Sequence, residues 1–367
     1  MIRVLHVVHA LTRRGGLSNC IMNYYRYIDR TKIQFDFLYF REVEDNFCEE
    51  IEQLGGRCFK LEEPSLSRSF IKKTNQFFKE HEGEWCFLHC HALFAVSVFS
   101  KIAKKNGVSA VIAHSHSTVY GSGLFKKVRN FVFIQQAAQL SDYRLACSKE
   151  AGNFMFGKNK EFFLLNNAID ISVYRSAQEK RAIVRRELSL ENAFVLGHVG
   201  SFAASKNHKF LIEIFNEVQK TVPNAKLLLV GGEGIAAGST LAQMKQKVVD
   251  LDLEDKVLFL GVRQDVPCLM SAMDAFVFPS LFEGFGLVLV EAQASGLPCT
   301  ASDRVPLAAK CTDLVSYLPL ESGAKAWAEH ILNHRTQERK VAIESFDRYN
   351  IDTQKQVLED MYLNMAK

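Results

Sequence analysis

One strand–turn–helix segment in the second half of the chain constrains the fold more than any other. Ala275–Phe278 is a short apolar run with the character of a buried parallel strand. Gly284 and Gly286 lie in the turn that follows, and Leu287–Ser295 is apolar nearly all round, which predicts a buried helix that stops at Gly296. Free backbone N–H groups and the helix dipole make such a helix N-terminus a site for an anion such as a diphosphate.

Two carboxylates flank this turn: Glu283 precedes the predicted helix, and Glu291 lies in its second turn. Helical side chains lean toward the helix N-terminus, so Glu291 is expected to reach a group beside the first turn. A carboxylate in so apolar a helix is costly without a partner. Two interpretations therefore stay open. Either the two carboxylates contact a ligand, or Glu283 is a charge favoured by the dipole and Glu291 pairs with a basic side chain.

The whole pattern P-S-x-x-E-G-F-G-x-x-x-x-E-A, followed by G-x-P, resembles the donor-binding signature of the retaining glycosyltransferases of family 4. The resemblance implies an α/β protein of the GT-B fold, with two Rossmann-like doubly wound domains that face an interdomain cleft. It implies that Glu283 contacts hydroxyls of the donor sugar in catalysis and that Glu291 binds the ribose of the nucleotide. The backbone between them is expected to hold sugar and phosphate through Gly284, Phe285, Gly286 and Leu287.

Strands alternate with helices along the whole chain, which predicts doubly wound parallel sheets with ligands at the carboxyl ends of the strands. The resemblance places the domain boundary at the segment Asn167–Asp170. The first domain, on the acceptor side, is therefore expected over residues 1–168, and the donor-binding domain over residues 169–349. In the family the last helix, here about residues 350–367, packs back on the first domain.

A second predicted phosphate loop opens the donor domain, where Gly200 precedes Lys206 by six positions at a helix start. Taken alone, the lysine is a solvated surface charge. The family pattern is G-R-x-x-x-x-K-N, in which Arg and Lys clamp the phosphates. This chain keeps Lys206 but has Ser201 at the Arg position, and losing a guanidinium is not a conservative change. Weaker donor binding, lost activity, or replacement by one of three other arginines all stay open: Arg13, Arg14 or Arg304.

Two further strand-end loops resemble donor-binding loops of the family. Gly15 and Gly16 follow the first strand; alone they indicate a tight turn, but in the family this loop lies over the donor phosphates and near the acceptor. The family often continues with a small residue and Glu, whereas this chain has Leu17-Ser18, so an acceptor contact from position 18 stays open. Val262 and Arg263 follow another strand and match the segment beside the nucleotide base.

Two histidines, His114 and His116, end the strand predicted over Val108–Ala113. Either one alone reads as a strand-end histidine that neighbouring backbone satisfies. In the family a histidine at this place contacts the donor sugar near the reaction centre, and His116 matches best, with His114 in reserve. The apolar and basic stretch 124–133 that follows fits an interfacial helix, or equally a core helix with a solvated basic edge.

Composition restricts the remaining classes. Residues 1–165 carry a net charge of +7 and residues 166–367 a net charge of −3, which fits an anionic acceptor, an anionic membrane surface or a solvated excess. Nine cysteines at scattered spacing indicate reduced thiols, and neither an apolar run long enough to span a membrane nor a convincing signal peptide is present, so a cytoplasmic protein is expected. The cluster Cys86–His91 is interpreted as a strand end, and no metal site is expected.

The resulting hypothesis is a metal-independent glycosyltransferase without a cofactor, of the hexosyl or N-acetylhexosaminyl type. It would move a sugar from a nucleotide-diphosphate sugar, expected to be a UDP-sugar, to a saccharide acceptor in capsule or exopolysaccharide synthesis. Details near Asn23–Arg30 and Ala146–Gly152 resemble bacterial members of that kind, which implies a lipid-linked acceptor, peripheral contact with the inner face of the cell membrane and no nucleic-acid partner.

Three rival classes were weighed. A metal-dependent GT-A transferase requires a D-x-D at a strand end, and Asp250-Leu251-Asp252 instead reads as a helix-to-strand turn. A dinucleotide oxidoreductase requires G-x-G-x-x-G after a first strand, and no glycine cluster here has that spacing. A catalytically weak or inactive partner subunit of the same fold is the serious alternative. Ser201 and Leu17-Ser18 favour it, and the intact carboxylates disfavour it.

Overall fold

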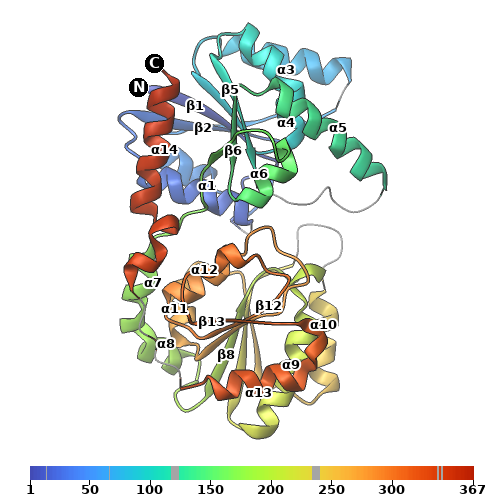
Figure 1. The fold of residues 1–367 in the computed structure, drawn as a ribbon, viewed down its shortest axis with the longest axis vertical. Coiled ribbons are helices and arrows are strands. Elements are labelled where there is room, and N and C mark those ends of the chain that lie inside the picture. The colour runs from blue at the N-terminus through green and yellow to red at the C-terminus, as the bar shows by residue number, and fades with distance from the viewer. Residues whose placement is uncertain (14, 66, 117–123, 234–239, 337–338, 340–341) are drawn as a thin grey trace. The chain divides into compact units, whose positions relative to one another are not determined.

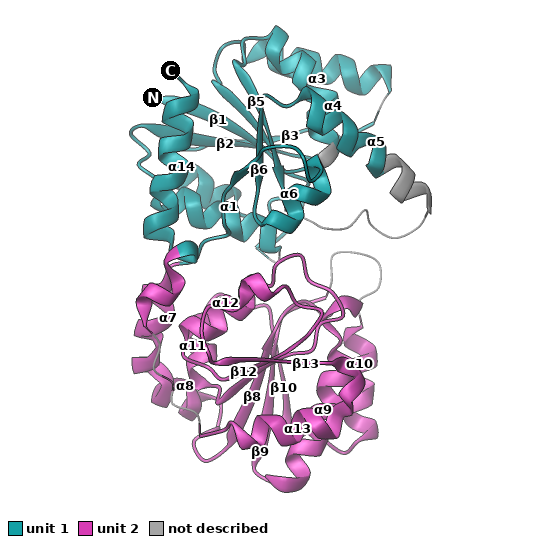
Figure 2. Ribbon diagram, in the orientation of Figure 1, with its two compact units in different colours: residues 1–169, 348–367 teal, residues 170–347 magenta. Residues whose placement is uncertain are grey.

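The computed structural model covers residues 1–367 and describes all of them except 14, 66, 117–123, 234–239, 337–338 and 340–341. The chain forms two compact units, coloured separately in Figure 2: Met1–Ile169 with Arg348–Lys367 is unit 1, and Asp170–Asp347 is unit 2. The sequence analysis places the first boundary after residue 168. In the structure the last helix belongs to unit 1.

Unit 1 contains a seven-stranded parallel sheet with the order β3-β2-β1-β4-β5-β6-β7. The strands are β1 (Ile2–Val7), β2 (Ile33–Tyr39), β3 (Cys58–Lys60), β4 (Phe87–Cys90), β5 (Ala110–Ser115), β6 (Tyr143–Ala146) and β7 (Phe163–Leu164). Strand β1 pairs with β2 on one side and with β4 on the other. The winding direction therefore reverses between β1 and β4, at the switch point where ligands bind in doubly wound folds.

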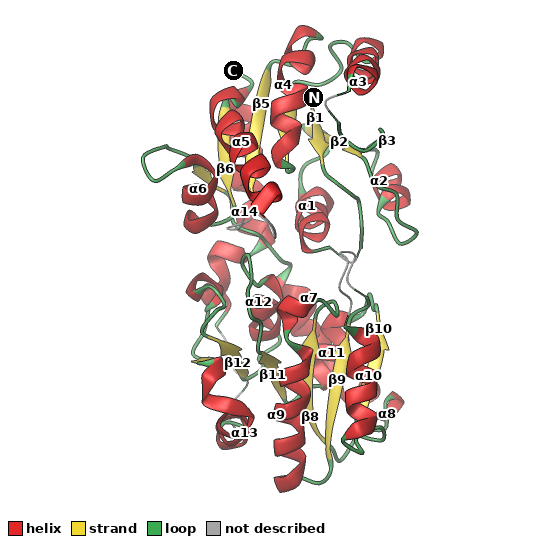
Figure 3. Ribbon diagram, turned by 90° about the vertical axis from the view of Figure 1, so that its right-hand side faces the viewer, coloured by secondary structure: helices red, strands yellow, loops and turns green. Residues whose placement is uncertain are grey.

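Helices cover both faces of this sheet, as Figure 3 shows. They are α1 (Gly16–Tyr27), α2 (Cys48–Gln53), α3 (Arg68–Glu80), α4 (Leu93–Lys105), α5 (Leu124–Leu140), α6 (Lys149–Phe156) and α14 (Ile351–Met365). Alternate strand residues point to opposite faces. Val4 and Phe87 therefore join the core that Tyr362 of α14 completes with α1, while Leu5 joins the core under α3 and α4. In Figure 1, α14 lies beside α1.

Unit 2 contains a six-stranded parallel sheet with the order β10-β9-β8-β11-β12-β13. The strands are β8 (Phe194–Val199), β9 (Ala225–Val230), β10 (Val257–Gly261), β11 (Ala275–Phe278), β12 (Cys299–Ser302) and β13 (Val315–Leu318). Here the winding reverses between β8 and β11. The first six strands of unit 1 and the six strands of unit 2 follow the same order, which confirms the predicted pair of Rossmann-like doubly wound sheets.

Helices also flank the sheet of unit 2: α7 (Ile171–Ser176), α8 (Arg181–Glu187), α9 (His208–Thr221), α10 (Leu241–Asp250), α11 (Val266–Ala272), α12 (Leu287–Ala294) and α13 (Gly323–Asn333). Short 3-10 turns join them: η1 (Ala177–Lys180), η2 (Ala204–Lys206), η3 (Leu307–Ala309) and η4 (Leu320–Ser322), and η5 (Ile343–Tyr349) precedes α14. Helix α12 ends before Gly296, which adopts φ 68°. Within the described residues, no helix is both long and apolar enough to cross a bilayer.

Candidate active site

The turn between β11 and α12 is built around Gly286. This residue caps α12 with φ 88° and ψ 47°, a left-handed conformation that glycine adopts without strain. A Cβ at this position would also lie 3.3 Å from both Phe278 and Val305. No side chain caps α12, so the N–H groups of its first turn have no side-chain acceptor. The structure thus forms the helix N-terminus that the sequence predicts as an anion site.

The loop after β8 lies against this turn. The backbone N–H of Leu281 donates to the Ser205 carbonyl at 2.7 Å, and Asn207 Nδ2 donates to the Pro279 carbonyl at 3.2 Å. Helix α9, which follows this loop, also has no side-chain cap. Because β8 and β11 are neighbours at the switch point of the sheet, two uncapped helix N-termini follow adjacent strands.

Lys206 and Glu283 form an ion pair between these two loops. The Lys206 Nζ lies 2.6 Å from Glu283 Oε1, and the two side chains are only 20% and 10% exposed. Ser280 Oγ donates to the same carboxylate oxygen at 2.7 Å. The ammonium lies 5.2 Å from the centroid of the Phe278 ring, within cation–π range. The two charges neutralise each other in this structure, so an anion that binds Lys206 must compete with Glu283.

Glu291 is hydrogen-bonded to Tyr174 of α7 rather than to a basic side chain. Burial raises the pKa of Glu291 to about 7, and the hydrogen bond from the Tyr174 hydroxyl lowers it by less. Burial and the nearby carboxylate raise the pKa of Tyr174 well above its usual value. Among the side chains that the structure describes, Tyr174 takes the place of the basic partner considered for Glu291. A phenol satisfies the carboxyl group without burying a second charge beside α12.

Ser201 lies in the loop after β8, and two of the three arginines considered as its replacement form ion pairs within their own units. Arg304 pairs with Glu321 at 2.8 Å, and Arg13, in unit 1, pairs with Glu50 at 3.0 Å. Arg14 lies outside the described residues. Within the described part of unit 2, Lys206 is the cation of this loop, and Arg304 is paired with Glu321 instead.

The predicted base-binding residues lie after β10. Val262 is 39% exposed, and a Cβ built on Gly232 would lie 2.7 Å from its Cγ2 atom. Arg263 makes two hydrogen bonds to Asp265, at 2.8 and 2.7 Å, and remains exposed. These contacts place the two side chains at the carboxyl end of β10. Their role in base binding stays a prediction.

In unit 1, the predicted glycine loop leads into α1. Gly15 caps the helix, and Gly16 is its first residue. Ser18 is only 3% exposed, its hydroxyl donates to the Ala10 carbonyl at 3.0 Å, and it accepts from the N–H of Thr12 at 3.3 Å. The Ser18 hydroxyl is buried and uses its hydrogen bonds within this loop. A contact between its side chain and the acceptor substrate is therefore not supported.

His116 follows β5 in unit 1, as predicted, and its Nε2 lies 2.9 Å from His91 Nδ1. Burial lowers the pKa of His116 to about 3, so the imidazole is neutral near pH 7. The reserve residue, His114, is buried and contacts His89. The sequence analysis treated His89 and His91 as strand residues without a role and did not single out His6. The available signal was a pair of histidines at alternate positions at the ends of two successive strands, β4 and β5.

The predicted interfacial stretch 124–133 forms the first part of α5. The side chains of residues 124–129 lie outside the described part of the structure. Phe131 and Val132 are 50% and 47% exposed.

Asp250 ends α10, and Asp252 lies in the following turn with φ 53°, which confirms the helix-to-strand turn at the D-x-D sequence.

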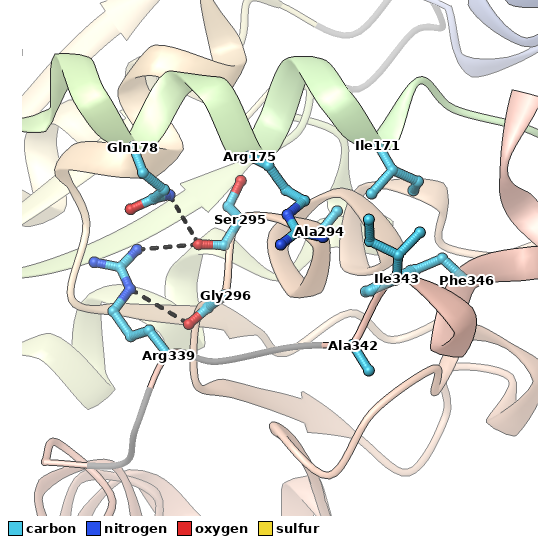
Figure 4. Close-up of a pocket in the computed structure, with 10 residues that line it drawn as sticks. All are labelled: Ile171, Arg175, Gln178, Ala294, Ser295, Gly296, Arg339, Ala342, Ile343 and Phe346. Carbon is cyan, nitrogen blue, oxygen red and sulfur yellow. Dashed lines mark hydrogen bonds between the residues drawn. The ribbon is translucent and has the colours of Figure 1, made fainter.

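A cavity of about 600 Å³ lies at the opposite end of α12 from Gly286 (Figure 4). Gln178 donates to the Ser295 carbonyl at 2.9 Å, and Arg339 donates to the Ser295 and Gly296 carbonyls, each at 3.3 Å. These side chains satisfy carbonyl groups at the helix C-terminus. Since that end carries the negative pole of the helix dipole, the cavity is not the predicted diphosphate site.

The geometry defines a class of protein: paired Rossmann-like units, one of which carries two uncapped helix N-termini, a lysine and two carboxylates at a sheet switch point. A family model described as "Glycosyl transferases group 1" matches residues 179–334. EpsF of Bacillus subtilis, a candidate glycosyltransferase, is 32% identical over 344 residues, which are 90% of this chain and 86% of EpsF. The chain therefore belongs to the group 1 glycosyltransferases.

Two further comparisons are more limited. The UDP-Gal:α-D-GlcNAc-diphosphoundecaprenol α-1,3-galactosyltransferase of Escherichia coli is 34% identical over 115 residues, which are 30% of this chain and 28% of that protein. The crystal structure of HepE from Anabaena in complex with UDP-glucose has a TM-score of 0.82 at 20% identity and covers 99% of this chain and 100% of HepE. This likeness shows the fold, and each chain has the GT-B architecture of two parallel-sheet Rossmann-like domains.

Proposed function

We propose that this protein is a retaining glycosyltransferase of family 4 that uses a UDP-sugar and a lipid-linked saccharide in cell-surface polysaccharide synthesis. One observation carries the proposal: two uncapped helix N-termini follow adjacent strands, with Lys206 and Glu283 between them. That arrangement suits a diphosphate next to a sugar. The printed name of the Escherichia coli relative, with UDP-Gal as donor and a diphosphoundecaprenol-linked acceptor, supports the two substrate classes.

In this proposal the diphosphate, the ribose and the sugar of the donor each contact a separate group of residues. The diphosphate binds to the N–H groups of Gly284–Leu287 and to Lys206, and Glu291 accepts from the ribose hydroxyls. Glu283 and His116 contact the donor sugar. The bond from the sugar C1 to the phosphate oxygen breaks, a bond from C1 to the acceptor oxygen forms on the same face, and the acceptor proton passes to the diphosphate. Lys206 and the helix dipoles stabilise the developing negative charge, so the proposal requires no metal ion and no cofactor.

Nucleotide binding is the first test. UDP, GDP, ADP and dTDP are compared by thermal shift and calorimetry on the wild type, Lys206→Ala and Glu291→Ala. A nucleotide at a hundredfold its Kd stabilises the folded protein by about 2.7 kcal/mol. Lys220→Ala is the matched control, because Lys220 pairs with Glu217 at the same distance of 2.6 Å but near the other end of α9. UDP should stabilise the wild type and the control but not the two site variants. If none of the four nucleotides binds, the proposal fails.

Transfer is the second test. The full chain is incubated with UDP-glucose, UDP-galactose or UDP-N-acetylglucosamine and with undecaprenyl-diphosphate-linked N-acetylglucosamine, with and without EDTA. The expected product keeps the anomeric configuration of the donor, as read by NMR, and forms at the same rate with EDTA. An inverted product would remove the retaining assignment, and loss of turnover in EDTA would remove metal independence.

A catalytically weak partner subunit is the second candidate, and Ser201 in place of the family arginine favours it. This function predicts UDP binding without transfer by the isolated chain.

Exposed Phe131 and Val132 on α5 motivate the further proposal that the protein works on the cytoplasmic face of the membrane. Co-sedimentation with vesicles of anionic and of neutral lipid tests that contact, with Phe131→Ser as the variant expected to bind less.

A further inference from the structure

Five histidines gather on one face of the unit 1 sheet, at the carboxyl ends of β1, β4 and β5: His6, His89, His91, His114 and His116. Two of these strands, β1 and β4, flank the switch point, where ligands bind in doubly wound folds. Only His116 has a role in the proposed function. Of the other four, His6, His89 and His114 are buried, at 2%, 1% and 5% exposed, and His91 is partly buried.

The rings form two hydrogen-bonded rows. In the first row, His6 Nδ1 lies 2.9 Å from His91 Nε2, and His91 Nδ1 lies 2.9 Å from His116 Nε2. The centroids of His6 and His91 are 5.2 Å apart with an interplanar angle of 14°, as expected for rings joined end to end. In the second row, the Tyr362 hydroxyl contacts His89 Nδ1 at 2.5 Å, and His89 Nε2 contacts His114 Nδ1 at 3.1 Å.

The two rows stack on each other. The His89 and His91 rings are 4.4 Å apart at 18°, and the His114 and His116 rings are 3.9 Å apart at 36°. Burial lowers the pKa of each ring in the first row, so all three imidazoles are neutral near pH 7. A neutral imidazole carries one N–H and therefore donates one hydrogen bond.

This restriction leaves two proton arrangements for the first row. Either all three rings carry the proton on Nδ1, or all three carry it on Nε2. His6 Nε2 is buried and has no hydrogen-bond partner in the described structure. The Nε2 arrangement would leave a buried N–H without an acceptor, whereas the Nδ1 arrangement leaves only a bare ring nitrogen. Unpaired buried N–H groups are the rarer of the two in proteins, so the Nδ1 arrangement is favoured.

We propose that His6 and His91 are positioning residues that fix His116 as an Nδ1–H hydrogen-bond donor. His116 then binds an oxygen atom of the ligand by donation and does not take its proton. The identity of that ligand, a donor sugar, rests on the proposed function, but the tautomer of His116 does not. In this arrangement both ring nitrogens of His116 are used, because Nε2 accepts from His91 and Nδ1 carries a proton. His116 therefore does not take the proton of the acceptor hydroxyl, which agrees with transfer of that proton to the departing diphosphate.

A metal ion is the competing explanation for the cluster. Ring nitrogens of His6, His89 and His91 lie within 4.8 Å of one another, as do those of His91, His114 and His116. Zinc with ligands at about 2.0–2.1 Å would hold tetrahedral nitrogens about 3.3–3.4 Å apart. The contacts that join the first row are 2.9 Å long and match hydrogen bonds instead.

The direct test is ¹⁵N NMR of the wild-type chain with labelled histidine, since protonated and bare ring nitrogens differ widely in shift. His116→Gln and His91→Gln identify the two sets of signals. The proposal expects both His116 and His91 to be neutral with the proton on Nδ1. Protons on Nε2, or stoichiometric metal found by elemental analysis of the purified protein, would overturn it. This measurement needs no substrate, so it stands even if the proposed function fails.

The functional test compares His91→Phe with His91→Gln. Phenylalanine keeps the ring and removes both hydrogen bonds, whereas glutamine offers one N–H donor and one carbonyl acceptor. With the UDP-sugar that the wild type uses, we expect His91→Phe to lower kcat about 10- to 100-fold, as for other residues that orient a functional group, while Kd for UDP is unchanged. His91→Gln should recover most of the loss. Wild-type kcat in His91→Phe, or equal losses in both variants, would refute the positioning role. His334→Gln, at the C-cap that follows α13 in unit 2, is the control.

Discussion

Replacing Glu283 by glutamine should tighten UDP binding while it removes sugar transfer. In the structure the Glu283 carboxylate holds the Lys206 ammonium at 2.6 Å, and Ser280 donates to the same oxygen. A diphosphate that binds Lys206 must break this pair. Glutamine preserves the size of the side chain and its bond from Ser280 but carries no charge, so Lys206 is free to bind the diphosphate. The donor sugar then loses the carboxylate that contacts its hydroxyls in the proposed function.

The magnitude follows from the distance and the burial. Two unit charges 2.6 Å apart attract by about 1.6 kcal/mol in water and about 6.4 kcal/mol at an effective dielectric constant of 20. Desolvation of the two charges cancels much of this attraction, since the side chains are 20% and 10% exposed. A net competition of about 1–2 kcal/mol remains, which corresponds to a Kd for UDP about 5- to 30-fold lower in Glu283→Gln.

Isothermal titration with UDP at low and high salt measures this effect. Glu217→Gln is the matched control, because its pair with Lys220 has the same 2.6 Å distance but is more exposed and lies away from the site. The control should bind UDP as the wild type does. If Glu283→Gln binds UDP with unchanged or weaker affinity, the diphosphate does not use Lys206, and the assignment of this loop is wrong. Retained transfer in the same variant would remove Glu283 from catalysis.

Three further outcomes follow from other contacts. Burial raises the pKa of Glu291 to about 7 from its ordinary 4.5, so the folded protein holds this proton more tightly than the unfolded chain. The protonated carboxyl contributes at most about 3 kcal/mol to the free energy of unfolding. This contribution is complete below pH 4.5 and is lost as the pH rises through 7. Urea unfolding at pH 4, 6 and 8 should show this loss in the wild type but not in Glu291→Gln. Gly231 has φ 145°, and a Cβ on it would lie 2.1 Å from the Gly200 carbonyl oxygen. Gly231→Ala should therefore lower the free energy of unfolding by about 1–3 kcal/mol and weaken UDP binding. Equal affinity for UDP would show that this turn does not shape the phosphate loop. The Asp36 carboxylate is fully buried and accepts hydrogen bonds from Arg3, Arg57 and Trp85. Asp36→Ala should lower the free energy of unfolding, measured with urea, by about 3–5 kcal/mol. A small decrease would show that the cluster is solvated in solution.

The elements of the site were predictable because their signals are local. Apolar runs bounded by glycines located β11 and α12, and a helix start was predicted at Lys206, close to His208, where α9 begins. Position 286 had to be glycine because the helix begins from a left-handed residue. Even the D-x-D sequence was correctly interpreted, since a polar helical segment precedes it.

The partners of the site residues were not predictable, because they come from distant parts of the chain. Lys206 and Glu283 are 77 positions apart, and His6 and His91 are 85 positions apart. Tyr174 satisfies Glu291 from α7, a helix that was not predicted from the sequence, which indicated only a domain boundary next to it. Periodicity shows which face of an element is buried, but it does not show which polar group meets another across a sheet or between helices.

The charges of the phosphate loop connect these findings to the question that Ser201 raises. In the family an arginine and a lysine clamp the diphosphate, whereas here the described residues show one lysine, and Glu283 already neutralises it. In the proposed function, an incoming diphosphate would therefore depend more on the N–H groups of the two helix N-termini, whose N-cap residues make no side-chain hydrogen bond to them. Diphosphate binding by two helix dipoles and by the Lys206 ammonium, which is already paired with Glu283, should be weaker than in a relative with both cations. It should still be selective for a diphosphate. Activity would then persist at high donor concentration, whereas a subunit that no longer transfers sugar has no reason to keep Glu283 and Glu291 at the turn.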